Sequence, residues 1–176
     1  MLKDTQYFKE KTLKTQIVIH HTAGGGNAEN VIHGWDFNPE RVATAFVIDS
    51  KGEVFKAFEP EFWAYHLGLK TSQNLSLNKG SIGIELCNWG QLIKKFRGFE
   101  FYHKYNDLQI ESLRKLILEL TAKFAINKKY NSDMWDISLN AILGKNGIYT
   151  HVSYRLDKND CSPQINLITM LQNLDK

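Results

Sequence analysis

The sequence predicts an α/β fold, in which one domain has a mixed central sheet of about five strands flanked by helices. Short apolar runs rich in β-branched residues alternate along the chain with longer segments in which apolar residues recur every three or four positions. The short runs are typical of buried strands, and the longer pattern is typical of amphipathic helices. Their alternation favours helices packed on a sheet.

Five segments have the composition of strands, and the clearest is residues 16–20, with three consecutive β-branched residues. The turn sequence Ser50-Lys51-Gly52 joins the second and third segments and predicts a hairpin. The segments after the first are residues 43–49, 53–57, 81–86 and 148–150.

Three segments have the signals of helices. Residues 28–35 follow Asn27 as a plausible N-cap, and residues 108–126 carry an apolar stripe after Asn106 or Asp107. Residues 163–174 predict a terminal helix, with Ser162 as its cap and a proline at its first position. Between the last two helices, the sequence predicts a surface loop or a small helix over residues 127–146. We expect residues 1–15 to form an N-terminal arm and residues 16–176 to form the domain.

Composition limits the classes of function. The 176 residues are 43% hydrophobic and 23% charged, which is typical of a soluble globular protein. A net charge of +3 is too small to indicate nucleic-acid binding, although it suits an anionic surface such as a bacterial envelope. The N-terminus lacks an apolar signal segment, and no apolar run has the roughly 18 residues of a membrane span. These features predict a protein made in the cytoplasm that leaves, if it leaves, by a route other than a secretory signal. We expect a monomer.

Two neighbouring histidines, a third histidine and a cysteine lie at or after the ends of predicted strands. His20 and His21 end the first strand, His151 ends the last apolar run, and Cys161 follows it. A buried strand provides the precision that a catalytic metal site requires. Two histidines and one cysteine suit a tetrahedral zinc ion with one position open for water. The sequence therefore predicts a zinc hydrolase.

Four blocks of sequence resemble the type-2 family of N-acetylmuramoyl-L-alanine amidases. They are residues 17–24 (IVIHHTAG), 63–68 (WAYHLG), 81–86 (SIGIEL) and His151 followed by residues 161–163 (CSP). That family includes phage amidase lysozymes, bacterial wall-recycling amidases and animal peptidoglycan recognition proteins. The resemblance extends from about residue 16 to about residue 170. It implies zinc-dependent hydrolysis of the amide between N-acetylmuramic acid and the L-alanine of peptidoglycan.

The resemblance also implies the metal ligands. His20 corresponds to the first ligand and His151 to the second, and strand alternation indicates that His21 points away from an ion that His20 binds. The third ligand in relatives is a cysteine or an aspartate, and this chain has Asp160 and Cys161 side by side. We expect Cys161 to be the third ligand because thiolate binds zinc more tightly. Asp160 remains the alternative.

Two catalytic residues follow from the same comparison. Glu85 stands where recycling amidases carry their catalytic glutamate. Burying a carboxylate in an apolar strand costs free energy, which favours a functional role for this residue. An ion pair with a lysine is the alternative interpretation. Relatives place a lysine two residues before the last ligand, where this chain has Asn159, so we expect Lys158 to stabilise the oxyanion. Phage lysozymes carry a tyrosine and a histidine near Thr44, and this chain has neither.

Four residues are expected to contact substrate. His66 lies in a block that borders the groove in relatives, and Trp63 could stack on a sugar, with core packing as the alternative for both. Thr44 and Asn159 complete the set. The absence of a signal peptide and of a wall-binding module favours a phage endolysin, released by a separate pore-forming protein. The alternatives are a cytoplasmic recycling amidase, a noncatalytic peptidoglycan-binding module and a zinc peptidase acting on the stem peptide.

Overall fold

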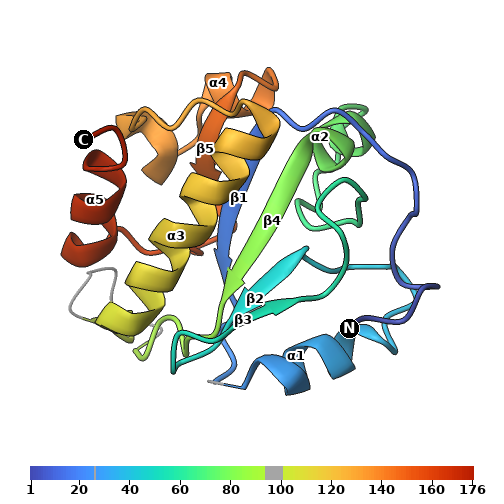
Figure 1. The fold of residues 1–176 in the computed structure, drawn as a ribbon, viewed down its shortest axis with the longest axis horizontal. Helices are drawn as coiled ribbons and strands as arrows, with labels where there is room; N and C mark the ends of the chain where they lie inside the picture. Colours follow the sequence, from blue (N-terminus) through green and yellow to red (C-terminus); the bar gives the residue numbers. More distant parts are fainter. Residues whose placement is uncertain (26, 94–100) are drawn as a thin grey trace.

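A five-stranded mixed sheet forms the centre of the molecule in the computed structural model, which describes residues 1–25, 27–93 and 101–176 (Figure 1). The order across the sheet is β3-β2-β4-β1-β5. Strands β2, β4, β1 and β5 are parallel, and β3 pairs antiparallel with β2 as the predicted hairpin. The α/β fold and the mixed sheet are thus confirmed. The strands are β1 (Gln16–His21), β2 (Phe46–Ile48), β3 (Val54–Lys56), β4 (Ser81–Leu86) and β5 (Gly147–Thr150).

Helices cover both faces of the sheet. Helix α3 (Asp107–Phe124) lies across one face with α5 (Ile165–Gln172) beside it (Figure 1). Leu77 of α2 (Asn74–Gly80) and Ala141 of α4 (Leu139–Ile142) pack with Val18 in a separate apolar cluster. Because side chains alternate along β1, Val18 faces this second cluster, whereas its neighbours Ile17 and Ile19 face the larger core.

The helix predictions hold except at the C-terminus. Helix α1 (Ala28–Trp35) has the predicted bounds, and the Asn27 side chain caps it by accepting a hydrogen bond from the Asn30 N–H. The terminal helix begins at Ile165, two residues later than predicted. The reason is that the Ser162 hydroxyl and N–H are directed at Tyr105 and do not cap a helix.

Two parts of the fold had no clear sequence signal. Helix α2 is largely polar, so it has no apolar stripe, and residues 127–146 contain the 3₁₀ turn Ser132–Trp135 as well as α4. Another 3₁₀ turn, His151–Ser153, follows β5 directly. Among the described residues, no helix has the length and apolar character needed to cross a membrane.

Residues 1–15 pack closely on the rest of the domain. The Leu2 side chain is buried, and its N–H donates to the Ala57 carbonyl at 3.0 Å. The Phe8 ring stacks on the Trp63 indole with 3.9 Å between their centroids. The segment therefore contributes to the apolar packing of the molecule.

The parallel strands bring their carboxyl ends to one edge of the sheet. His20 is near the end of β1, and Glu85 lies directly opposite it in the register of β1 with β4. His151 follows the last residue of β5, which also pairs with β1. Ligands in open α/β sheets bind outside the carboxyl ends of the strands. This edge is therefore the place to look for a site.

Candidate active site

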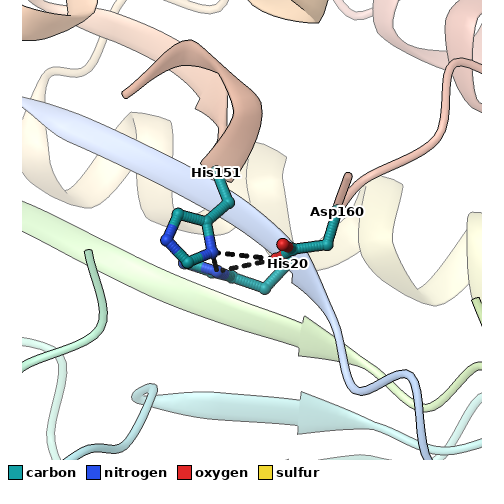
Figure 2. Close-up of side chains that lie close together, drawn as sticks. All are labelled: His20, His151 and Asp160. Carbon is teal, nitrogen blue, oxygen red and sulfur yellow. Dashed lines mark hydrogen bonds and ion pairs between the residues drawn. The ribbon is translucent and has the colours of Figure 1, made fainter. Parts of the chain in front are cut away.

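Three ligand atoms meet at this edge, from His20, His151 and Asp160 (Figure 2). The His20 Nδ1 atom is 3.1 Å from His151 Nδ1 and 3.2 Å from Asp160 Oδ2, and His151 Nδ1 is 3.0 Å from Asp160 Oδ2. In a tetrahedral zinc site with bonds of about 2.0–2.1 Å, neighbouring ligand atoms are about 3.3 Å apart. The three atoms therefore have nearly the separations that zinc requires.

The protonation states of two of these groups also suit a cation. Burial lowers the pKa of His20 to about 4, although the Asp160 carboxylate, 3.2 Å from His20 Nδ1, opposes the shift, so the imidazole is neutral at pH 7. Burial alone would raise the pKa of Asp160, but its close contacts with the His151 and His20 rings outweigh burial and hold that pKa below its ordinary value. An ionised carboxylate with imidazole nitrogen is a donor set that zinc prefers.

Cys161, the expected third ligand, is not part of this cluster. Its buried thiol interacts with Tyr105 and is not among the three ligand atoms that lie within 4.8 Å of one another. Asp160 and Cys161 direct their side chains to different partners. His20 and His21 do the same, since His21 Nδ1 lies 2.9 Å from the Tyr105 hydroxyl oxygen. Thus the Asp160 side chain lies beside His20, whereas the side chains of Cys161 and His21 both interact with Tyr105.

Glu85 and Lys158 line a cavity of about 760 Å³ that also exposes the three-residue cluster. Burial raises the pKa of Glu85 well above its ordinary value, and the negative charge of Asp160 adds to the shift, while the positive charge of Lys158 opposes it. Lys158 stands two residues before Asp160. This is the spacing that the family resemblance implies between the lysine and the last ligand, if Asp160 is that ligand.

Thr44 and Asn159 also line the cavity, although both use their side chains within the protein. The Thr44 hydroxyl is buried and donates to the Phe46 carbonyl at 2.9 Å. The exposed Asn159 amide donates to the Gln91 side-chain oxygen at 3.4 Å. Thr44 is thus a buried part of the cavity wall, whereas Asn159 is an exposed residue of that wall.

His66 lines the cavity as well, but both of its ring nitrogens have partners in the protein. Its Nδ1 is 3.0 Å from His20 Nε2, and its Nε2 is 2.9 Å from the Ser81 hydroxyl oxygen. His66 thus contacts a residue of the cluster. Sequence reasoning missed Ser81, whose only signal is its place at the start of the SIGIEL block.

Trp63, an expected substrate contact, does not line the cavity. Its indole is 4% exposed, stacks on Phe8, and donates its N–H to Glu10 at 2.9 Å. The stacking surface is thus occupied by the N-terminal segment. Trp35 lines the cavity instead, and the exposed Trp89 lines a neighbouring pocket that includes Glu85.

Comparisons with known proteins agree with the geometry. A family model described as N-acetylmuramoyl-L-alanine amidase matches residues 11–163. No curated protein matches the sequence.

Solved structures share the fold at low identity. A point mutant of PlyL is 15% identical, with a TM-score of 0.65, over 100% of this chain and 96% of that one. The catalytic domain of XlyA is also 15% identical, with a TM-score of 0.62, over 97% of this chain and 92% of that one. The amidase AmiD from E. coli, solved with a muropeptide substrate, is 21% identical with a TM-score of 0.53, over 68% and 48%.

Proposed function

The chain belongs to the N-acetylmuramoyl-L-alanine amidase family, whose substrate is peptidoglycan, and we propose that it works with one zinc ion held by His20, His151 and Asp160. The observation that carries this proposal is the triangle of ligand atoms with sides of 3.0 to 3.2 Å. Bound there, zinc would lower the pKa of a water molecule toward about 7 and polarise the scissile carbonyl.

Glu85 is proposed as the general base and acid. Its carboxylate removes a proton from the attacking water and returns it to the nitrogen of the leaving L-alanine. Its position opposite His20 in the strand register and its place in the cavity wall support this role. A raised pKa supports it too, because a more basic carboxylate accepts a proton more readily from water.

Lys158 is proposed to stabilise the oxyanion that develops on the scissile carbonyl. Its side chain is half-buried in the cavity wall, and its charge influences both His20 and Glu85. A fixed positive charge in a partly water-excluded site stabilises developing negative charge more than it would in water.

The choice of third ligand is tested by comparing Asp160→Asn with Cys161→Ser. We expect Asp160→Asn to lose stoichiometric zinc, measured by elemental analysis, together with release of L-alanine amino termini from purified peptidoglycan. Cys161→Ser should keep both, because the thiol faces Tyr105. The opposite pattern would return the ligand role to Cys161. Release of reducing sugars in place of amino termini would overturn the amidase reaction.

The biological setting that we propose is a phage endolysin acting on a host cell wall. Support comes from structural neighbours, among them a mutant endolysin from Bacillus subtilis, 16% identical with a TM-score of 0.56 over 88% of this chain and 82% of that one. A recycling amidase would act on soluble muropeptides and leave intact walls untouched. Clearing of purified walls therefore favours the endolysin, and activity on soluble muropeptides alone favours recycling.

A further inference from the structure

The outer nitrogen of His151 has a partner that sets its tautomer. His151 Nε2 lies 3.0 Å from the Leu67 carbonyl oxygen. A carbonyl oxygen can only accept, so Nε2 must carry the proton. A neutral ring has one N–H, and therefore His151 Nδ1 presents a lone pair toward Asp160.

A longer chain of hydrogen bonds sets the tautomer of His20. The Ser81 hydroxyl donates its only proton to the Leu77 carbonyl at 2.7 Å, so its oxygen must accept from His66 Nε2. A neutral imidazole that donates from Nε2 to the Ser81 hydroxyl has Nδ1 as its acceptor. His66 Nδ1 then accepts from His20 Nε2, and His20 Nδ1 is left with a lone pair.

We propose that His66 and Leu67 form the positioning element of the metal site, holding His20 and His151 in the tautomers that direct both Nδ1 lone pairs at one point. The proposal rests on the zinc site proposed above. Ligating histidines usually donate their second N–H to a carboxylate, a carbonyl or water. Here one histidine donates to a carbonyl, and the other donates to a third histidine.

The backbone of this dipeptide is itself held in place. The Asn78 side-chain oxygen accepts hydrogen bonds from the N–H groups of His66 and Leu67, at 2.7 and 3.1 Å. Asn78 is fully buried, and its amide donates to the carbonyl and side-chain oxygens of Asn74 one turn earlier in α2. Helix α2 therefore fixes the two acceptors relative to the sheet.

Gly83 makes room for the His66 ring against β4. A β-carbon at this position would lie 2.7 Å from Thr44 Cγ2 and 3.3 Å from His66 Cγ. Any side chain there would push the ring or the Thr44 wall away. The glycine in the SIGIEL block thus allows His66 to approach His20.

The arrangement brings two lone pairs close together without a proton between them. The two Nδ1 atoms are 3.1 Å apart, and the carboxylate oxygen is equally near. Three partially or fully negative atoms at this separation repel one another, and a cation placed among them removes that repulsion. The positioning element therefore favours the metal-bound state.

Removal of the His66 nitrogens provides the test. In His66→Phe, His20 loses the acceptor that fixes its tautomer, and we expect zinc affinity, measured by competition with a chromophoric chelator, to fall about 10- to 100-fold. His66→Gln should recover part of the loss, because its side-chain oxygen can accept from His20. The matched control is His33→Gln on the exposed face of α1, which should bind zinc like the unmodified protein.

Ser81→Ala keeps the proposal falsifiable if His66→Phe does not fold. It removes only the hydroxyl that accepts from His66, and Ser76→Ala, on the exposed side of α2, is its control. We expect weaker zinc binding in Ser81→Ala with little change in the thermal unfolding of the metal-free protein. Unchanged zinc affinity in folded His66→Phe and in Ser81→Ala would overturn the proposal.

The tautomers are read directly from the ¹⁵N shifts of the histidine rings in the metal-free protein. We expect protonated Nε2 and unprotonated Nδ1 for both His20 and His151. A proton on His20 Nδ1 would overturn the positioning role whatever the enzyme does. Failure to bind zinc or to cleave peptidoglycan would overturn the proposed function instead, so the two failures are distinguishable.

Discussion

Glu85 and Lys158 are coupled residues on the wall of one cavity. Burial and the charge of Asp160 raise the pKa of Glu85, and the charge of Lys158 lowers it. The lysine thereby keeps more of the glutamate in the ionised form that accepts a proton from water. Its effect on the base is separate from its proposed effect on the oxyanion.

Lys158→Met should move the acidic limb of the pH profile for kcat/KM to higher pH. Without the cation, the pKa of Glu85 rises further, so the base becomes ionised only at higher pH. A bound metal ion would move the acidic limb to lower pH in both proteins. The difference between the two proteins therefore isolates the contribution of the lysine. Lys51→Met, in the exposed β2–β3 turn, should leave the limb unchanged. A limb that stays in place or moves to lower pH would contradict the coupling.

At the scale of elements, the start of α3 joins two segments that carry residues of the proposed zinc site. Tyr105, two residues before α3, places its hydroxyl 2.9 Å from His21 Nδ1 and 3.2 Å from the Ser162 N–H, which donates to it. His21 follows His20, and Ser162 lies two residues after Asp160. The hydroxyl therefore ties the end of β1 to the segment that presents the carboxylate, from the face of the sheet opposite the site.

Tyr105→Phe should lower the free energy of unfolding by about 1–3 kcal/mol, because it leaves buried polar groups of His21 and Ser162 without a partner. It should also weaken zinc binding, since Asp160 is no longer held relative to His20. Chemical denaturation and chelator competition measure the two effects.

The matched control is Tyr130→Phe, which removes the acceptor of the Trp135 indole N–H far along the chain from any ligand residue. It should lose stability without losing zinc affinity. Equal zinc affinity in Tyr105→Phe and the unmodified protein would show that the hydroxyl does not position Asp160.

At the scale of the whole molecule, the buried amine of Lys14 joins the N-terminal segment to the sheet. Its side chain is 1% exposed, and its amine donates to the carbonyls of Lys79 and Ser81 at 2.8 and 3.2 Å. Burial lowers its pKa to about 7, even though Glu61 and Glu10 oppose the shift. The folded protein thus releases a proton there that the unfolded chain still binds.

Lys14→Met should flatten the dependence of stability on pH between 7 and about 10. In that range the unfolded chain holds the Lys14 proton and the folded protein does not, so the free energy of unfolding of the unmodified protein rises with pH. Urea unfolding of the metal-free proteins at about pH 7 and about pH 9.5 measures the slope. The exposed Lys115→Met is the control, and a slope in Lys14→Met equal to that of the control would contradict the assignment.

The sequence alone determined the periodic features of this protein. Three β-branched residues predicted β1, and an apolar stripe after Asn106 predicted α3 to within two residues at either end. Alternation along β1 predicted that His20 and His21 point to opposite faces, and the structure separates them in this way. Such features follow from the geometry of a strand or a helix, which repeats along the chain and is written into the residues themselves.

Only the tertiary structure decided which side chains meet. Asp160 and Cys161 are adjacent in sequence, and each is a chemically acceptable ligand, but in the folded protein it is Asp160 that lies with His20 and His151. The face of the Trp63 indole is covered by the ring of Phe8, 55 residues earlier in the chain. The partners of His20 and His151 come from His66 and Leu67, 46 and 84 residues away. Contacts of this kind belong to pairs of segments brought together by packing, and no local pattern in one segment specifies the other.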